Sequence, residues 1–589
     1  MSSLTGLSHF DTVGEPFFPR IMSIHLLKEE EETIARTLCE EEKDMSLKPE
    51  PIHPVPQETA RVAKAAFPKG SIFMSMRDEL GVLSQDEAFA ALFPNNGQPA
   101  ITPWRLALVT IMQFAERLPD RQAADAVRGR LDWKYALSLE LEDSGFDFSV
   151  LSEFRSRLIA GNAEYLLFDT MLDHLKQRGL VKAGGRQRTD ATHVLAKVRA
   201  LNRMVCAGET LRAALNSLAL VAPKWLLAFA PQEWHARYDH RVEEFWFPRD
   251  PAKRTAMIEL IGADGYQLLT AIDTRSDLNW LKHISAIQTL RHVWVQQFEL
   301  VEDHVHFRSD DNIPPPSKMI CSPYDTQATY GRKLTAWWEG YKVHLTESCD
   351  EDQPRLITHV ETSLAGKGDV DVTAVIHHAL QGKELLPKEH LTDTNYAESK
   401  QFVASQLDYG IELIAPTRAD NKWQGQAQQG FDANSFQLDW HAHKAICPTG
   451  HESSSWTPAI DRRDNEVIKI KFSTKDCQPC PCRSQCTKTD RRTITVRKEE
   501  HHMALQKARA REKTPEFWEV YHKRAGIEAT ISQGVRAFRM RRSRYEGLAK
   551  THLQHLACAT AMNIVRVVAW LQEPSVAPTR TSHFAALVA

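Results

Sequence analysis

Apolar residues recur at every third or fourth position between residues 65 and 180, a spacing that predicts amphipathic helices. One helix should begin at Thr102-Pro103, where a capping hydroxyl precedes a proline in the first helical position. A second should begin at Pro119-Asp120 and a third at Ser149. We therefore expect an all-helical N-terminal domain over residues 65–180.

A second pattern, in which apolar and polar residues alternate, begins near residue 188 and predicts β-strands. The predicted elements are strands 188–198, 335–346 and 355–362, helix 370–380, strand 389–393, helix 398–407, strand 411–415, and helices 514–538 and 551–571. With two inserts removed, this is the order of a ribonuclease-H-like α/β core. We expect that core over residues 181–420 and 514–572, with a helical insert at about 200–314 and a Cys-rich insert at 421–513.

Both ends of the chain have compositions that disfavour folding. Residues 1–64 are first acidic and then rich in proline, with little apolar surface to offset the entropy of ordering, so we expect a disordered tail. Residues 573–589 are expected to form a second, flexible tail. We also hypothesise that Met45 is the natural start, which would place residues 1–44 upstream of it.

The overall composition is that of a globular protein, with 589 residues, 42% hydrophobic and 25% charged, and a formal net charge of -3. Positive charge is nevertheless concentrated: residues 521–550 contain eight Lys and Arg against two Glu, and residues 491–513 contain eight against three. Such runs would supply a surface that neutralises DNA phosphates, although a solvated helix face would equally explain the second run.

The predicted N-terminal helices also carry arginines on their polar faces. They are Arg121, Arg128, Arg130, Arg155 and Arg157. These helices could dock on duplex DNA, although a scaffold or dimerisation module would have the same pattern. The chain shows neither a secretory signal nor a window of about 18 apolar residues, so we expect a cytoplasmic protein.

Three acids lie where the predicted topology would bring them together. Asp190 is in the first strand of the core, Asp393 follows the fourth strand, and Glu528 is on the penultimate helix. Three converging carboxylates form a cage for hard cations such as Mg²⁺, and a pair of such ions commonly cuts and joins phosphodiesters in proteins. Simpler roles are open too: Asp393 could cap the helix that begins near Ala397, and Glu528 could pair with Arg524 one turn back.

Several sequence blocks occur together in an order typical of one family. They are Ala66–Gly70, Asp120–Arg128, Gln187–Val194, Ser322–Asp325, Trp338–His344, Arg524–Glu528 and Arg542–Thr551. On these blocks the chain, from Met45 to about Leu571, resembles the DDE-type transposases of bacterial insertion sequences, in the group that contains the IS four and IS five families. The family signature Tyr-x2-Arg-x3-Glu-x6-Lys matches through Glu528, but its lysine position holds Val535, with Arg536 beside it.

The resemblance implies a helical InsH-type domain that recognises terminal inverted repeats, joined to a core that cleaves and transfers DNA strands. Asp190, Asp393 and Glu528 would hold two Mg²⁺ ions, or Mn²⁺. The residues expected to contact DNA are Tyr521, Arg524, Arg536, Arg541, Arg542, Arg544 and Lys550. Family behaviour suggests a homodimer on double-stranded DNA in the bacterial nucleoid. A catalytically inactive, domesticated DNA-binding protein and a ribonuclease-H-like nuclease without strand transfer remain alternatives.

The second insert contains a dense cysteine cluster, Cys477-x2-Cys480-Pro-Cys482-Arg-x2-Cys486, with Cys447 upstream. In a chain without an export signal, such spacing favours metal ligation over disulfides. We expect Cys447, Cys477, Cys480 and Cys486 to hold a structural Zn²⁺, with Cys482 as the alternative ligand. Free thiols in a loop and an iron–sulfur cluster are competing interpretations.

Overall fold

The computed structural model describes residues 45–49, 51–94, 97–199, 201–333, 335–419, 422–424, 430–461, 464–572 and 587. These residues belong to two compact units. The smaller unit, within residues 1–50 and 86–102, contains the parallel strands β1 (Met45–Ser46) and β2 (Gln98–Pro99) and the 3₁₀ helix η2 (Asp86–Leu92). The larger unit, residues 51–85 and 103–589, contains the elements that follow. Residues 1–44 and 573–586, parts of the two expected tails, lie outside the described residues.

The N-terminal part of the larger unit is helical, as the apolar spacing predicts. Its helices are α2 (Gln57–Ala66), α3 (Ile72–Leu80), α4 (Pro103–Glu116), α5 (Asp120–Gly129), α6 (Leu131–Ala136), α7 (Ser149–Ala160) and α8 (Leu166–Gln177). The three predicted helix starts are confirmed, because α4, α5 and α7 begin at Pro103, Asp120 and Ser149. The expected cap at Thr102 is not formed, since its hydroxyl is buried without a hydrogen-bond partner.

One boundary differs from the sequence expectation. Residues 57–64, expected to lie in the disordered tail, instead form most of α2. Ala63 of this helix is fully buried against Met74 and Tyr135. The small apolar face of α2 is therefore enough to order the segment once a neighbouring helix covers it.

The centre of the larger unit is a mixed sheet. Its strands are β3 (Arg186–Leu195), β6 (Thr329–Lys333), β7 (Ala336–Ser348), β8 (Ile357–Leu364), β9 (Glu389–Leu391) and β10 (Glu412–Ile414). Strand β7 pairs antiparallel with β3, β6 and β8, whereas β3, β9 and β10 pair in parallel, so that β3 lies between β7 and β9. Apart from β6, which has no predicted counterpart, the strands follow the order expected from the sequence.

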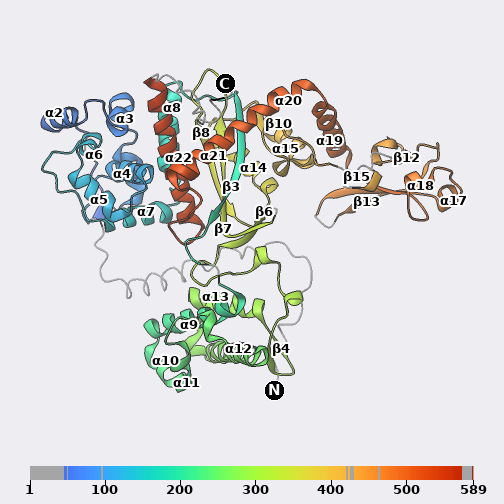
Figure 1. Ribbon diagram of the computed structural model, residues 1–589, viewed down its shortest axis with the longest axis horizontal. Helices are drawn as coiled ribbons and strands as arrows, with labels where there is room; N and C mark the ends of the chain where they lie inside the picture. Colours follow the sequence, from blue (N-terminus) through green and yellow to red (C-terminus); the bar gives the residue numbers. More distant parts are fainter. Residues whose placement is uncertain are drawn as a thin grey trace. The chain divides into compact units, whose positions relative to one another are not determined.

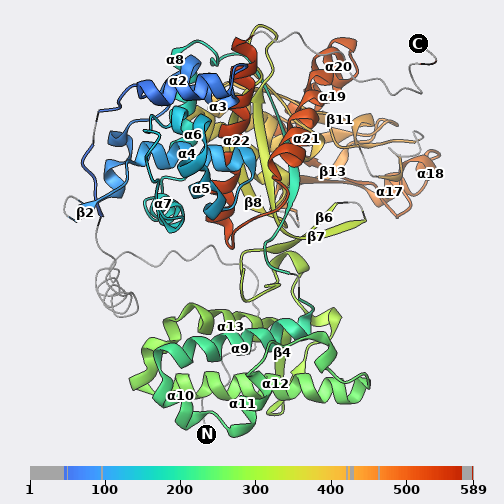
Figure 2. The same ribbon diagram turned by 60° about the vertical axis from the view of Figure 1, so that its left-hand side comes forward.

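Helices flank this sheet in the predicted order. They are α14 (Thr373–Gly382), α15 (Ser399–Tyr409), α20 (Pro515–Tyr521), α21 (Gly526–Phe538) and α22 (Leu548–Leu571). The helix predicted over 514–538 is interrupted by the 3₁₀ helix η10 (His522–Ala525), which separates α20 from α21. The long, largely buried α22 packs against β8 on one side and against α3, α4, α7 and α8 on the other, and thus joins the sheet to the N-terminal helices (Figures 1 and 2).

The first insert has its own hydrophobic core and is mainly helical. Its elements are α9 (Arg203–Val221), α10 (Pro223–Phe229), α11 (Gln232–Tyr238), α12 (Pro251–Thr274), α13 (Ser285–Gln297), β4 (Phe298–Val301) and β5 (His304–Phe307). The sequence predicted helix as far as Val301, but β4 and β5 form a hairpin whose two turn residues, Glu302 and Asp303, have positive φ. Positive φ at both residues is typical of the two-residue turns that match the twist of a β-hairpin. The pattern of apolar residues along this segment does not indicate such a turn.

Helix α9 is the one described helix that is long and apolar enough to cross a membrane. More than half of it is buried within the insert. Val205, Leu211 and Leu218 contribute to the insert's core, so α9 has the character of a core helix.

The second insert is a small β-rich module. Its elements are β11 (Gln437–Asp439), β12 (Lys444–Ile446), β13 (Ser453–Ile460), β14 (Glu466–Phe472), α17 (Thr474–Cys477), α18 (Arg483–Cys486) and β15 (Thr493–Arg497), followed by α19 (Glu499–Glu512). Strands β13, β14 and β15 form an antiparallel sheet. A compact core that includes Phe436, Ile470 and Ile494 lies beside Cys447, Cys477 and Cys486.

A buried ion pair links the central sheet to its last two helices. Glu347 of β7 is fully buried, and one of its oxygens pairs with Arg188 of β3 at 2.6 Å. Its other oxygen accepts hydrogen bonds from Thr530 of α21 and from Arg566 of α22, the latter at 3.0 Å. A guanidinium nitrogen of Arg188 also donates to the carbonyl of Lys523 in η10. One carboxylate thus connects four elements.

We predict that Glu347→Gln lowers the free energy of unfolding by about 3 kcal/mol, because it leaves the guanidinium of Arg188 buried without a countercharge. The matched control is Glu351→Gln, which removes an ion pair to Lys523 from a side chain that is 83% exposed and should leave stability almost unchanged. Denaturant unfolding monitored by circular dichroism would measure both, and equal effects would contradict the proposed anchoring.

Candidate active site

The register of the sheet places two of the three predicted acids beside each other. In the parallel pairing of β3 with β9, Arg188 lies opposite Leu391. Asp190 follows two residues later within β3, and Asp393 follows two residues after Leu391, just beyond the end of β9, so the two acids come from neighbouring segments at this part of the sheet. Burial raises the pKa of Asp190, and the negative charge of Asp393 raises it further.

Asp393 also caps a short helix. Its carboxylate accepts a hydrogen bond from the backbone N–H of Asn395 at 2.8 Å and forms the N-cap of the 3₁₀ helix η8 (Thr394–Tyr396). The capping role considered from the sequence is therefore present, although on η8 and not on the helix after Ala397. A carboxylate has about four lone-pair positions, so capping leaves acceptor capacity that a cation could use.

The third acid, Glu528, is exposed on the first turn of α21. The sequence left open that it pairs with Arg524, but Arg524 instead pairs with Asp190 at 2.8 Å. Residues four apart lie on the same side of a helical segment, so Glu528 is one turn beyond the arginine that contacts Asp190. Helix α21, which carries Glu528, packs against β3, the strand that carries Asp190.

The approach of α21 to β3 requires a glycine. A Cβ atom at Gly526 would lie 2.1 Å from the guanidinium of Arg188, which is itself held by Glu347 and the carbonyl of Lys523. Gly526 therefore sets how closely the segment with Arg524 and Glu528 approaches the sheet.

Burial dominates the electrostatics of the acid pair. Removal of Asp190 from water raises its pKa, while the positive charge of Arg524 and a backbone N–H bond from Ala191 act in the opposite direction. Burial likewise raises the pKa of Tyr521, whose ring stacks on Phe517 at 5.6 Å. Within the described part of the chain, no three His, Cys, Asp or Glu side chains are arranged to hold a metal ion. The acids are thus neighbours without forming a closed cage.

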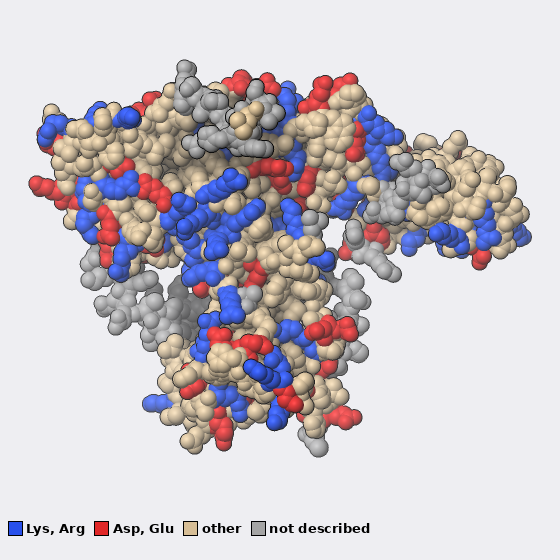
Figure 3. Space-filling view, viewed as in Figure 1, with Lys and Arg blue, Asp and Glu red and all other residues tan. Residues whose placement is uncertain are grey.

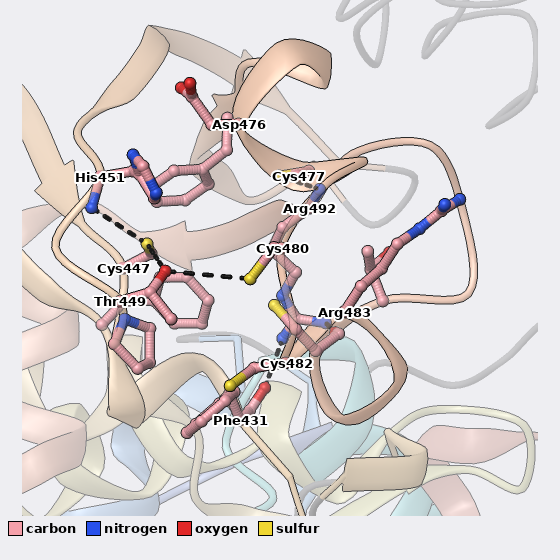
Figure 4. Close-up of a pocket in the computed structure, with 15 residues that line it drawn as sticks. Phe431, Cys447, Thr449, His451, Asp476, Cys477, Cys480, Cys482, Arg483 and Arg492 are labelled. Atoms are coloured by element: carbon pink, nitrogen blue, oxygen red, sulfur yellow. Dashed lines mark hydrogen bonds between the residues drawn. The ribbon is translucent and has the colours of Figure 1, made fainter.

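The cysteines of the second insert gather around one pocket (Figure 4). Cys447 follows β12, whereas Cys477, Cys480 and Cys486 lie between β14 and β15, and all four line the same pocket together with Cys482. Burial raises the pKa of the Cys486 thiol, and Cys477, Cys480 and Cys447 raise it further, against the opposing charge of Arg492. The sequence expected a distant segment to complete the cluster, and Cys447 occupies that position.

The predicted DNA-contacting arginines divide into inward-facing and exposed groups. Arg541 donates to the hydroxyl of Thr192 at 2.7 Å, and Arg544 donates to the carbonyl of Leu118 at 2.7 Å with its guanidinium over the ring of Phe114. Exposed positions hold Arg536, Arg542 and Lys550. Figure 3 shows Lys and Arg gathered on the face where α21 and α22 lie.

The N-terminal arginines divide in the same way. Arg155, expected on a polar face, is buried, pairs with Asp120 at 2.5 Å and lies over the ring of Tyr545. Arg130 and Arg157 are engaged in ion pairs within their own region. Arg121 and Arg128 are exposed.

Comparison with known proteins yields two family matches. Residues 62–157 match a family model described as "Transposase domain (DUF772)", and residues 446–568 match one described as "Transposase DDE domain". The chain thus carries two transposase domains, an N-terminal one and a DDE domain. No curated protein matches it.

The two matches cover different parts of the transposase. The first spans the N-terminal helices from within α2 to within α7, and the second runs from the Cys-rich module through α21 into α22. A DDE transposase domain implies a ribonuclease-H-like core and phosphoryl-transfer chemistry, and the mixed sheet agrees with that fold. Glu528 lies inside the second match, whereas Asp190 and Asp393 lie outside both.

Sequence reasoning missed two features of the transposase's site. Glu347, the anchor of Arg188, lies one residue beyond the predicted strand 335–346, and its charge gives no sign of complete burial. Lys333 also acts on Asp190 and opposes the rise in its pKa. Its approach depends on how the β6–β7 hairpin bends, which alternation of polar and apolar residues does not encode.

We predict that Gly526→Ala lowers the free energy of unfolding by about 1–3 kcal/mol, because the added methyl group must displace either Arg188 or α21. Gly382→Ala, at the end of α14, meets nothing within 4 Å and should be neutral or slightly stabilising. Denaturation midpoints, with amide hydrogen exchange along α21, would compare the two variants. Unchanged exchange in α21 of Gly526→Ala would show that the close approach is not essential.

Proposed function

We propose that this chain is the transposase of a bacterial insertion sequence, which binds terminal inverted repeats and catalyses divalent-metal-dependent cleavage and transfer of DNA strands. The observation that supports this most directly is that Asp190 lies on β3 and Asp393 directly follows the parallel neighbour β9, with the helix that carries Glu528 packed on β3. The two transposase domains make phosphodiesters the expected substrate.

The donor set fits a hard divalent cation, Mg²⁺ or Mn²⁺. Asp190 and Asp393 offer adjacent carboxylate oxygens, the ligand type that such ions prefer, and Glu528 would supply the third group from α21. When bound, the ions would activate the attacking oxygen and neutralise charge on the leaving oxygen. Arg524 now neutralises Asp190, and its planar guanidinium is also suited to hold a phosphate of the DNA.

The contact with DNA would come mainly from exposed cations. Arg536, Arg542 and Lys550 are exposed at the surface, and we propose that they bind the phosphate backbone. Arg541 and Arg544 donate hydrogen bonds to other parts of the protein, and we propose that they fix the conformation of the segment that also carries Arg542. A homodimer that holds both ends of the element remains part of this proposal.

We predict that Asp190→Asn retains binding to the element's terminal repeats but lowers Mg²⁺-dependent strand cleavage by more than about 100-fold, because the variant loses a charged ligand. Asp408→Asn, an exposed substitution on α15, is the control and should cleave normally. The assay incubates protein and Mg²⁺ with DNA that spans the ends flanking the gene and resolves cleaved and joined products on a gel.

The products of the wild-type chain distinguish the alternatives. Cleavage without joined products would favour a nuclease, whereas repeat-specific binding without cleavage would favour an inactive DNA-binding protein. Cleavage that survives Asp190→Asn would reject the assigned site.

We also propose that the Cys-rich module binds one structural Zn²⁺ through Cys447, Cys477, Cys480 and Cys486. The four thiols come from two segments that meet at one pocket, and thiolates in such a set suit tetrahedral zinc. Thr449 contacts the sulfur of Cys447 at 3.1 Å, and the N–H of His451 donates to the same sulfur at 3.3 Å, so the first ligand is already oriented (Figure 4). With four thiolates the ion would have no open position and would act by stabilising the module.

We predict that the purified protein contains about one zinc per chain by elemental analysis, and that Cys480→Ser loses it while Cys482→Ser retains it. A chelator should then expose the core of the module to proteolysis, because metal binding contributes to the folding free energy of such domains. Loss of zinc in Cys482→Ser would assign Cys482 as a ligand. Bound iron together with visible absorbance would show that the module holds an iron–sulfur cluster and not zinc.

A further inference from the structure

Residues 319–325 connect the helical insert to the central sheet. On the insert side, the hydroxyl of Tyr324 donates to the carboxylate of Glu209 in α9 at 2.6 Å. On the sheet side, the hydroxyl of Tyr341 in β7 donates to the carboxylate of Asp325 at 2.7 Å. These contacts define a junction, made of residues 319–325 with α9 and β7, through which the insert is held on the sheet.

The junction contains a buried carboxylate without a hydrogen-bond partner. Glu339 lies two residues before Tyr341 on β7, so both side chains leave the same face of the strand. Glu339 is only 7% exposed, and neither of its carboxylate oxygens has a partner. Asp325 is 3% exposed; its Oδ1 accepts hydrogen bonds from Tyr341 and from the backbone N–H of Ala328, but its Oδ2 has no partner. Three carboxylate oxygens of the junction are therefore buried without a donor.

The difference between the two acids indicates which of them is neutral. An ionised carboxylate that loses its water and gains no donor is far less stable than a neutral carboxyl group in the same place. Asp325 has two donors on one oxygen, and such donors stabilise the charged form. Glu339 has none, and the charge of Asp325 acts against its ionisation. Burial, and then the charge of Asp325, raise the pKa of Glu339 to about 7.

The other titratable groups around Glu339 offer no positive charge. Its charge acts on the thiols of Cys206 in α9 and Cys321, and on the phenols of Tyr330 in β6 and Tyr341 in β7. Thiols and phenols are neutral or negative, and burial raises the pKa of all four groups. Among the residues that the structure describes, no three side chains of metal-binding type are arranged around an ion. A proton is therefore the countercharge that fits this place.

We propose that Glu339 is protonated in the closed junction, and that loss of this proton loosens the contact of the helical insert with the central sheet. Opening of the junction exposes Glu339 to water, where it ionises with an ordinary pKa of about 4.3. The closed junction retains the proton until the pH reaches the raised pKa of about 7. Opening therefore becomes easier as the pH rises between these two values, and it no longer changes above them. The inference goes beyond the proposed function, because it needs neither DNA nor bound metal.

Amide hydrogen exchange of the full chain at about pH 5.5 and about pH 8, corrected for intrinsic exchange rates, tests this inference. Protection of α9 and of residues 319–325 should be roughly 10- to 30-fold lower at the higher pH, the change that this difference in pKa produces. Glu339→Gln has a neutral side chain at both pH values and should show little dependence on pH. Glu233→Gln, which alters an exposed acid on α11 of the same insert, is the matched control and should keep the full dependence.

A second variant keeps the test decisive if Glu339→Gln does not fold. Asp325→Asn removes the negative charge that opposes ionisation of Glu339, so the fall in protection should end at a lower pH. An unshifted profile in Asp325→Asn, equal pH dependence in Glu339→Gln and the wild type, or no dependence in the wild type would each overturn the inference. Protection at the higher pH that Mg²⁺ or K⁺ restores would also overturn it, because the junction would then hold a cation and not a proton.

Discussion

The geometry of the candidate site depends on the buried charge of Glu347. A carboxylate without access to water is tolerated only when its oxygens are fully engaged, and Arg188, Thr530 and Arg566 fulfil that requirement from three other elements. These hydrogen bonds depend on direction, so they restrict how α21, through Thr530, packs against β3. Arg188 extends this constraint by binding the carbonyl of Lys523, next to the arginine that contacts Asp190. The position of Glu528 therefore follows from an ion pair in which it takes no part.

The second constraint is the register between β3 and β9. A shift of one residue in either strand would move a carboxylate to the opposite face of the sheet, because side chains alternate along a strand. Buried hydrogen bonds oppose such a shift: the hydroxyl of Thr189 contacts the imidazole of His390 at 2.7 Å, and His390 contacts His377 of α14 at 2.8 Å. These hydrogen bonds, close to Asp190 and Asp393, fix the register between β3 and β9. The acids thus lie together because the polar groups beside them are paired inside the core.

Much of the fold follows from local sequence signals, whereas the arrangement of the site does not. Prolines mark the starts of α4 and α5, and alternation identifies the long strands of the sheet. These signals are local, so they fail where tertiary contacts decide. The β4–β5 hairpin depends on positive φ at its turn, and the burial of Arg155 depends on Asp120 and Tyr545, which the sequence places far away. The local pattern also does not tell whether Arg524 pairs with Glu528 or with Asp190. In the structure it pairs with Asp190.

The cationic character of the surface is also a product of the fold and not of composition. The formal net charge is -3, yet the arginines of the C-terminal segment have unequal roles. Arg541 and Arg544 are held by Thr192 and Leu118, and in this way they fix the loop after α21 between β3 and α4. With that loop fixed, Arg536 and Arg542 remain exposed in defined positions. A flexible loop would lose conformational entropy on contact with a phosphate backbone, whereas a braced one has already lost it during folding. In the proposed complex with DNA, the inward-facing arginines would therefore contribute through the order that they impose on their exposed neighbours.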